Sequence, residues 1–480
     1  MPTTLPLRIP LGQKALIAIT TIWTWMAGLA FCHAGQPADL PDLDVTFISR
    51  TPRYPRLVVS YHRRADGLVG DVRPYLTPEE EAKKRWPAPG DTVTFTAHVK
   101  NHGNAPVAGY ACLWAIDGQV VAAPQGGALV PEQEATFKLT WRWQDGPHTV
   151  SFQVDPQDVV PQLSQRNNQL TDRTDALSFH FHVEQSLYDY FRTIKNSWGT
   201  YSWEDWAQSQ VALMNDLFRA AIYPTSPHGV TERVRLDMIT IHPDGELDPE
   251  GTHAPEDIEW DGRWGFKATY LTDKFYEKNP WAIAHEWSLI HELGHQIGRI
   301  DLYCLDVTAQ QNLVNHEAYR SKYRHCLMHS GIYLPQDEVH FFCEHTAASL
   351  NRDKGVRRGH FGEYLLDLPA DNQLLVLSAD HRPLRNVAVS VYRAEPLGYT
   401  EKRIAPPPAF SGKTDDDGLF PLGANPFGEI NNWGTNGVLL VKVEKAGRAC
   451  FRWLEICDFN LEFWRGNRDR AVYQILSDLR

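Results

Sequence analysis

The spacing of two histidines, a glutamate, a glycine and an aspartate in one stretch of the chain is typical of a metal site. The stretch is AHEWSLIHELGHQIGRIDLYC, residues 284–304. On a helix, His291 and His295 lie one turn apart on the same face. Zinc accepts imidazole nitrogens at about 2.0–2.1 Å, and this spacing brings both rings within reach of one ion. Glu292 is turned by about 100° from His291, so we expect it to face a water at the metal.

A third ligand is needed, because a catalytic zinc usually has three protein ligands and a water. Gly298 tolerates the left-handed conformation that ends a helix and turns the chain sharply. Asp301, three residues later, can then return to the metal. The neighbouring pair His285-Glu286 has Leu289 where a second histidine would be needed, so we expect no metal site there.

The pattern HExxHxxGxxD resembles the zinc motif of the metzincin metallopeptidases, in its snapalysin-like variant. The resemblance covers about residues 190–350 and implies an α+β catalytic domain with a Zn2+ cofactor. It implies His291, His295 and Asp301 as the metal ligands. Glu344 stays open as an alternative third ligand, since other zinc peptidases take a glutamate from a later helix.

The same family has a methionine in a tight turn beneath the zinc. Met328, in HCLMHSGIY at residues 325–333, is the counterpart that the resemblance implies. Tyr333 follows this turn and is, by position, a candidate donor to the oxyanion. HFFCEHTAASL, residues 340–350, is similar to the helix that closes the domain in reprolysin-like members. By the same resemblance, GRWGFKATYL, residues 262–271, lies near the edge strand that aligns an extended peptide through main-chain pairing.

These residues predict hydrolysis of peptide bonds. Zinc polarises a water and the scissile carbonyl, while Glu292 takes the proton of the water and later delivers it to the leaving amine. We expect a secreted bacterial zinc endopeptidase that acts on a protein or peptide substrate. The alternative is a cell-surface adhesion or ligand-binding protein with an inactive or structural metallopeptidase domain. A glycan-binding surface protein is a third hypothesis, suggested by the 16 Trp and by the two β-sandwich modules that are predicted below on either side of this region.

The middle of the chain changes to helical spacing. Ser202 and Asp205 form a capping box, and apolar residues follow at helical intervals from Trp206 to Ala221. RVRLDMITIH and GRWGFKATYL are predicted as strands. Asn279-Pro280 is predicted to open the helix that carries the histidines. We therefore expect an α+β domain over residues 186–358.

Residues 35–185 are predicted to form an immunoglobulin-like β-sandwich. Val93, Phe95, Ala97 and Val99 alternate with polar residues, and a turn follows at residues 101–103. PDLDV, GDTVTFTAHVKNHGNAPVAGY and RNNQLTD resemble the CARDB domain, a cell-adhesion-related module of exported bacterial proteins, over most of residues 41–180. The resemblance implies an accessory or binding role. A cell-surface or glycan ligand of the sandwich domains is therefore a further hypothesis.

Residues 359–480 are predicted to form a second β-sandwich. Five short apolar segments, among them NQLLVLSAD and GVLLVKVEKAG, indicate strands. VAVSVYRAE followed by FSGKTDDDGLFPL is similar to transthyretin-like and carboxypeptidase-regulatory-like modules. We expect Asp415, Asp416 and Asp417 to form a turn, because the ligand spacing of a calcium loop is missing. The fold class is thus multidomain, with the α+β domain between two β-sandwiches.

The N-terminal segment predicts where the protein is located, and the net charge indicates which partners it is expected not to bind. The chain has 480 residues, enough for about three domains of ~150 residues. Its net charge of −12 and the lack of a basic run argue against nucleic acid as a partner. Arg8 and Lys14, the apolar run at residues 15–31 and the small residue Ala34 predict a signal peptide over residues 1–34. No other stretch reaches transmembrane length, so we expect export without a membrane span.

Export permits disulfides among the six cysteines that follow the predicted signal peptide. Connectivity does not follow from the sequence. The pairs that we prefer are Cys304 with Cys326 and Cys450 with Cys457. Cys112 and Cys343 are left without an assigned partner.

Overall fold

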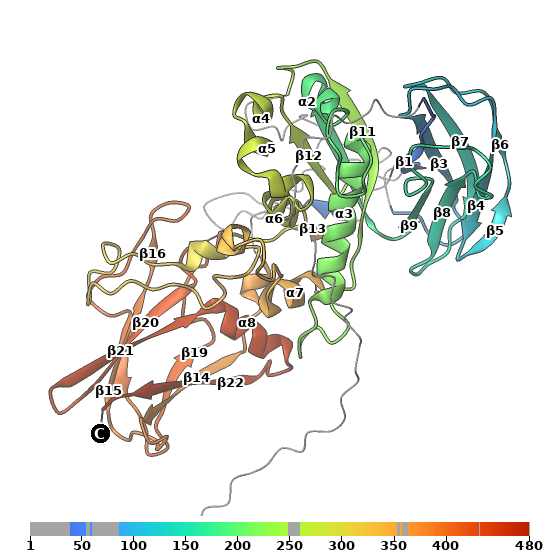
Figure 1. The fold of residues 1–480 in the computed structure, drawn as a ribbon. Helices are drawn as coiled ribbons and strands as arrows, with labels where there is room; N and C mark the ends of the chain where they lie inside the picture. Colours follow the sequence, from blue (N-terminus) through green and yellow to red (C-terminus); the bar gives the residue numbers. More distant parts are fainter. Residues whose placement is uncertain are drawn as a thin grey trace, which may run out of the picture. The chain divides into compact units, whose positions relative to one another are not determined.

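The computed structural model describes residues 39–53, 58–59, 86–247, 260–352, 356–357, 363–431 and 433–479. Figure 1 shows that the chain is mostly β-sheet, with most of its helices in the middle region. The predicted signal peptide, residues 1–34, lies outside the described residues. None of the described helices combines the length and the apolar character that crossing a membrane requires.

The first strands form two sheets around a core of their own. In β3 (Thr92–Asn101), Val93, Phe95, Ala97 and Val99 are buried, as their alternation predicts. β3 lies between β1 (Leu43–Thr51) and β7 (Glu134–Arg142) in one sheet. The other sheet has the order β5 (Gln119–Ala122), β4 (Tyr110–Ile116), β8 (Thr149–Val154), β9 (Gln169–Arg173), with β6 (Gln125–Gly126) beside β4. The antiparallel pairing and the separate core make this region a β-sandwich.

The next strand belongs to the middle region, which corrects the expected boundary at residues 185 and 186. β10 (Leu177–Glu184) lies between β11 (Val234–His242) and β12 (Gly262–Phe266) in a parallel sheet. All eight residues of β10 are buried, as in a central parallel strand. The N-terminal sandwich therefore ends with β9. The boundary was misplaced because alternation identifies a strand and does not identify the sheet that it joins.

Within the described residues of the middle region, six helical segments accompany this sheet. They are α2 (Gln185–Tyr190), α3 (Trp203–Ala220), α4 (Thr269–Thr272), α5 (Phe275–Lys278), η2 (Pro280–Ile283) and α6 (Trp287–Gln296). Ser202 caps α3 as predicted, since its side chain accepts a hydrogen bond from the Asp205 N–H at 3.0 Å. The helix expected to open at Asn279-Pro280 is instead two helices. The chain leaves the helical conformation at Glu286 (φ −87°, ψ 84°), so the histidines belong to a second helix that begins at Trp287.

Short elements then lead into the C-terminal region. These are η3 (Leu302–Leu305), η4 (Ser330–Tyr333), α7 (Glu344–Leu350), β13 (Val356–Arg357), which pairs with β2 (Val58–Val59), and η6 (Glu363–Leu366). They carry the residues that surround the histidines. α7 occupies the segment that was expected to form the closing helix.

The C-terminal region has a three-stranded and a four-stranded sheet. The first contains β19 (Leu419–Gly423), β14 (Asp371–Ser378) and β22 (Arg470–Ser477). The second contains β18 (Phe410–Lys413), β15 (Ala388–Arg393), β20 (Val438–Lys445) and β21 (Arg448–Glu455). α8 (Ile456–Trp464) connects β21 to β22, and the two-stranded ladder of β16 (Glu395–Pro396) and β17 (Lys402–Arg403) lies outside both sheets. The five segments predicted as strands are all strands.

Asp415 Oδ1 accepts hydrogen bonds from the N–H groups of Asp417 and Leu419 at 2.9 and 2.8 Å, so the acidic run forms a turn, as expected.

Buried side chains of the middle region and of both C-terminal sheets form one continuous hydrophobic core, which includes Leu293, Val376 and Leu439. The middle and C-terminal regions are therefore packed as one body around the helix that carries the histidines.

Candidate metal centre

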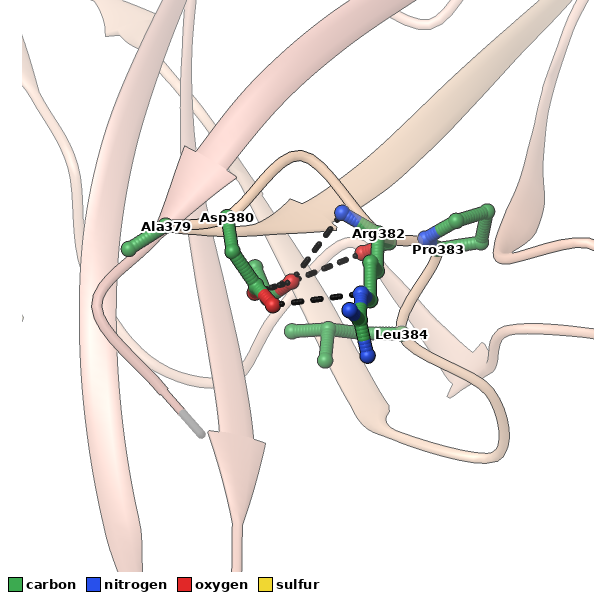
Figure 2. Close-up of a pocket in the computed structure, with 6 residues that line it drawn as sticks. Ala379, Asp380, Arg382, Pro383 and Leu384 are labelled. Atoms are coloured by element: carbon green, nitrogen blue, oxygen red, sulfur yellow. Dashed lines mark hydrogen bonds and ion pairs between the residues drawn. The ribbon is translucent and has the colours of Figure 1, made fainter. Parts of the chain in front are cut away.

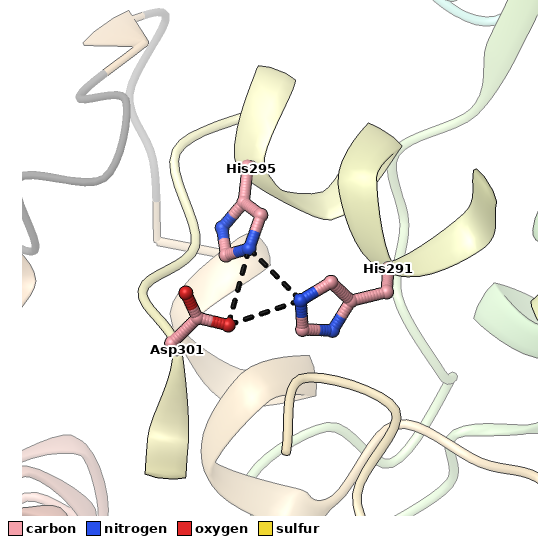
Figure 3. A group of neighbouring side chains, drawn as sticks. All are labelled: His291, His295 and Asp301. Carbon is pink, nitrogen blue, oxygen red and sulfur yellow. Dashed lines mark hydrogen bonds and ion pairs between the residues drawn. The ribbon is translucent and has the colours of Figure 1, made fainter. Parts of the chain in front are cut away.

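Three ligand-type side chains converge at the end of α6. Figure 3 shows the imidazoles of His291 and His295 projecting from the helix toward the Asp301 carboxylate. The two Nε2 atoms are 3.0 Å apart, and they lie 3.0 and 3.2 Å from Asp301 Oδ1. All three side chains are buried. Within the described part of the chain, no other set of three His, Cys, Asp or Glu side chains is grouped this closely.

Main-chain carbonyls fix which imidazole nitrogen faces the centre. His291 Nδ1 lies 2.7 Å from the Leu327 carbonyl oxygen, and His295 Nδ1 lies 2.6 Å from that of Arg299. A carbonyl oxygen only accepts, so each Nδ1 carries a proton, and in the neutral form of each ring the lone pair of Nε2 is directed inward. Two imidazole nitrogens and a carboxylate oxygen are a set of ligands that could hold a metal ion and that fits zinc.

The end of α6 turns Asp301 back toward the histidines. Gly298 has φ +92°, the left-handed conformation that was expected there. Its N–H donates to the His295 carbonyl oxygen at 2.9 Å, and the Arg299 N–H donates to that of Gly294 at 3.0 Å. These bonds close the helix and reverse the chain within a few residues. The reversal explains how residues 291 and 301 meet.

Met328 packs directly against the turn of α6 between the two histidines. A Cβ atom added to Gly294 would lie 2.4 Å from Met328 Sδ, so the thioether fills the space that a side chain at this position would occupy. The Met328 carbonyl oxygen accepts the Leu302 N–H at 2.7 Å, next to Asp301. The preceding carbonyl, that of Leu327, accepts from His291. This turn therefore supports both segments that supply ligands.

Glu292 lies beside the ligand cluster and is not part of it. It is half-buried on α6, one residue after His291. Burial lowers the pKa of His291, but the hydrogen bond and charge of Asp301, together with the charge of Glu292, raise it above its ordinary value. Burial also raises the pKa of Tyr270 to about 12, and the charges of Glu286 and Glu292 add to that rise. Glu292 is thus a carboxylate close to the centre with its oxygens outside the ligand set.

Two other candidates from the sequence lie apart from the cluster. Glu344, the alternative third ligand, begins α7 and accepts hydrogen bonds from Thr225 Oγ1 at 3.0 Å and Arg465 Nη2 at 3.2 Å. It is not among the residues that meet at the centre. Tyr333 ends η4 with 81% of its surface exposed, so it is not packed against the cluster.

Two tyrosines that were not predicted as site residues contact Asp301. The Tyr399 hydroxyl donates to Asp301 Oδ2. Burial raises the pKa of Tyr303, and the charge and hydrogen bond of Asp301 raise it further. Tyr303 is two residues from Asp301, so its proximity was available in the sequence. Tyr399 is 98 residues away, and no local pattern indicates it.

The cysteine pairs expected from the sequence are wrong. All six described cysteines are free thiols. The neighbour of Cys326 is Cys343, whose N–H donates to Cys326 Sγ at 3.2 Å. Cys450 contacts Ser477 Oγ at 3.1 Å, while Cys457 belongs to α8. Cys304 and Cys326 were paired because they flank the region of the expected site, whereas the fold places Cys343 beside Cys326.

A surface pocket in the C-terminal region is not a second site. It follows β14 and is lined by Ser378, Ala379, Asp380, Arg382, Pro383 and Leu384. Its polar groups bind one another, because Ser378 Oγ donates to Asp380 Oδ1 at 2.6 Å and Arg382 Nε pairs with Asp380 Oδ2 at 3.3 Å. Figure 2 shows Asp380 and Arg382 facing each other. These contacts are those of a turn. The grouped side chains that could bind a metal, His291, His295 and Asp301, lie in the middle region.

Comparison with known proteins identifies one region. The CARDB family model matches residues 73–172, which confirms the CARDB prediction for the N-terminal sandwich. The CARDB domain of a Pyrococcus furiosus protein, solved in complex with di-metal ions, is 19% identical and has a TM-score of 0.19; the match covers 28% of this chain and 87% of that one. A domain from Methanosarcina acetivorans, described as part of a cell surface protein, is 22% identical with a TM-score of 0.18, over 28% of this chain and 90% of that one. No curated protein matches the chain.

Proposed function

We propose that this protein is an exported, zinc-dependent endopeptidase whose middle region is a metzincin-like catalytic domain. One observation carries the proposal: two imidazole nitrogens and a carboxylate oxygen, all buried, meet within 3.0–3.2 Å of one another beside Glu292. The methionine turn beneath α6 and the glycine turn after it support the same conclusion. The glycine belongs to the HExxHxxGxxD motif at residues 291–301, and Met328 is a separate feature outside that motif.

The chain supplies a base next to the three ligands. His291, His295 and Asp301 would hold the metal. When bound, zinc supplies a Lewis acid that lowers the pKa of water and polarises a carbonyl. Glu292 accepts the proton of the attacking water and returns it to the leaving amine. Its place one residue after His291 puts it on the neighbouring face of the same helix turn.

Strand β12 is the element best suited to hold an extended peptide. It pairs with β10 on one side, and among the described strands it has no partner on the other. It also packs against α6, since the carbon that a side chain would add at Gly262 lies 3.1 Å from Gln296 Cβ. A peptide aligned along this edge would be bound by main-chain groups with little dependence on its sequence. We therefore propose protein or peptide substrates, consistent with a role outside the cell.

The test combines metal content with hydrolysis of casein or gelatin by the mature protein and by Glu292→Gln. We expect one zinc per chain in both and a loss of activity of about 10²–10⁴-fold in the variant. Glu277→Gln, on the exposed surface of α5, is the control and should keep both properties. Full activity in Glu292→Gln, or a parent protein without zinc, would contradict the proposal.

A second candidate function is supported by the burial of the ligands. His291, His295 and Asp301 are 5%, 3% and 2% exposed, which also suits a structural metal in a cell-surface binding protein. The same experiment separates the two functions. Zinc in the parent and in Glu292→Gln, with no hydrolysis of any peptide pool by either, favours the structural role.

A further inference from the structure

A tyrosine from the C-terminal region binds the Asp301 oxygen that does not face the histidines. Tyr399 lies in the loop between β16 and β17, and its hydroxyl donates to Asp301 Oδ2. Oδ1 of the same carboxylate faces the Nε2 atoms of His291 and His295. The two oxygens of Asp301 are therefore divided between the metal centre and the C-terminal region.

The ring and main chain of Tyr399 are held on several sides. The Thr435 hydroxyl donates to the Tyr399 carbonyl oxygen. The rings of Trp433 and Tyr303 stand nearly perpendicular to the Tyr399 ring, with centroids 5.6 and 6.3 Å away. Leu397 N–H donates to the Glu401 carbonyl oxygen at 2.8 Å, which closes the loop. The hydroxyl thus reaches Asp301 from a fixed position.

The loop is also fastened to the segment that follows Asp301. Lys402 is 2% exposed, and its ammonium donates to the Cys304 carbonyl oxygen. The Ile404 N–H donates to the Gln311 carbonyl oxygen at 2.8 Å, and the Leu313 N–H donates to that of Ile404 at 2.8 Å. These contacts tie residues 397–404 to residues 304–313. The position of Asp301 and the position of Tyr399 are therefore coupled through the main chain.

An aspartate has a short side chain, so a small rotation changes which oxygen faces the metal. A donor on Oδ2 opposes that rotation and keeps Oδ1 directed at the imidazoles. Hydrogen bonds of this kind to a ligating carboxylate commonly change metal affinity by about 10–100-fold. A tyrosine hydroxyl is suited to this hydrogen bond, because the rigid ring holds its single O–H donor at a fixed distance from the main chain.

We propose that Tyr399 is a positioning residue of the metal centre, and that the C-terminal region completes that centre through residues 397–404. This inference rests on the proposed function only in requiring that His291, His295 and Asp301 bind zinc. It assigns to the C-terminal region a role in metal binding that an accessory sandwich would not have.

The test measures zinc affinity of the full chain by competition with a chromophoric chelator. Tyr399→Phe keeps the ring and removes the donor, and we expect zinc to bind about 10–100-fold more weakly. Tyr473→Phe is the matched control. Its hydroxyl also makes a buried hydrogen bond in the C-terminal region, to Asn372 Oδ1 at 2.9 Å, and its loss should leave the zinc affinity unchanged. Thr435→Val, which removes a hydrogen bond to Tyr399, should weaken zinc binding in the same direction.

Two further readouts separate positioning from loss of structure. The urea midpoint of the metal-free protein should be similar in Tyr399→Phe and Tyr473→Phe. The visible absorption of the Co²⁺-loaded protein should change in Tyr399→Phe alone, because it reports the ligand arrangement. Equal zinc affinity and an equal Co²⁺ spectrum in both variants would overturn the positioning role.

The outcomes also separate this inference from the proposed function. A parent protein that binds zinc tightly and hydrolyses no peptide would contradict the peptidase and leave the role of Tyr399 intact. A parent protein that binds no zinc would overturn both. Normal hydrolysis with unaltered zinc affinity in Tyr399→Phe would overturn only the positioning role.

Discussion

At the scale of single residues, the identity of the third ligand is decided by what surrounds two carboxylates. Asp301 is 2% exposed, and its Oδ1 lies 3.0 and 3.2 Å from the Nε2 atoms of His291 and His295. Glu344 already accepts from Thr225 and Arg465, so its charge is neutralised by an ion pair. A carboxylate whose oxygen faces two imidazole nitrogens is placed to bind the same metal as they do. One that is paired with a guanidinium is not.

This difference predicts opposite results for two alanine substitutions. Asp301→Ala should weaken zinc binding by more than the roughly 10–100-fold typical of an outer partner, because it removes a ligand itself. Glu344→Ala should leave zinc affinity within a few-fold of the parent. Metal content after dialysis against a weak chelator measures both. Zinc lost from Glu344→Ala and kept by Asp301→Ala would reverse the assignment.

At the scale of elements, α6 is shaped by the methionine turn below it. Gly294 lies in the helix interior, where alanine is ordinarily favoured by about 1 kcal/mol. Here the space for a methyl group is occupied by Met328 Sδ, and Met328 is itself fully buried. The glycine therefore allows the close approach of the turn that holds His291 and the segment after Asp301.

Gly294→Ala is accordingly expected to destabilise the protein by about 1–3 kcal/mol through overpacking. Met328→Ala alone should also destabilise it, because it leaves a cavity. The double variant should lose less than the sum of the two, since the added methyl group then enters the vacated space. Urea denaturation of the four proteins gives the coupling energy. Additive losses, or a Gly294→Ala protein more stable than the parent, would contradict this packing.

At the scale of the whole molecule, buried charges join the N-terminal sandwich to α3. His102 Nε2 lies 3.2 Å from Asp44 Oδ2 and 3.6 Å from Glu204 Oε2. All three side chains are 6% exposed or less. Burial lowers the pKa of His102, but the charges of Glu204 and Asp44 outweigh burial and raise it to about 9. The contact is therefore strongest when His102 is protonated.

This arrangement predicts a loss of stability in mildly alkaline solution. A folded pKa above the ordinary value of 6.5 gives stability that is complete below about pH 6.5 and is lost as the pH rises through about 9. The free energy of unfolding should fall by up to about 3 kcal/mol across this window. His102→Gln should flatten the fall, whereas His148→Gln, on a more exposed pair with Asp117, should not.

Urea denaturation at pH 6.5, 7.5 and 9, with chelator present throughout, measures the effect. The comparison of parent and variant removes contributions from other titrating groups. A His102→Gln protein with the same pH dependence as the parent would contradict the assignment.

The sequence by itself determined the features that depend on local period and on single-residue conformations. The alternation in β3, the cap at Ser202 and the left-handed turn at Gly298 follow from short-range sterics and hydrogen bonding. The four-residue interval between His291 and His295 put both rings on one face for the same reason. These preferences act within a few residues, so the strand, the cap and the turn can be predicted without knowledge of the rest of the fold.

Only the tertiary structure decided which distant segments meet. β10 joined β11 and β12 instead of the preceding sandwich, Cys326 became the neighbour of Cys343, and Tyr399 reached Asp301 across 98 residues. Each outcome depends on how buried apolar faces pack together, because the hydrophobic effect is non-directional and many pairings satisfy the same local pattern. The packing of one hydrophobic core across the middle and C-terminal regions therefore selected the partners.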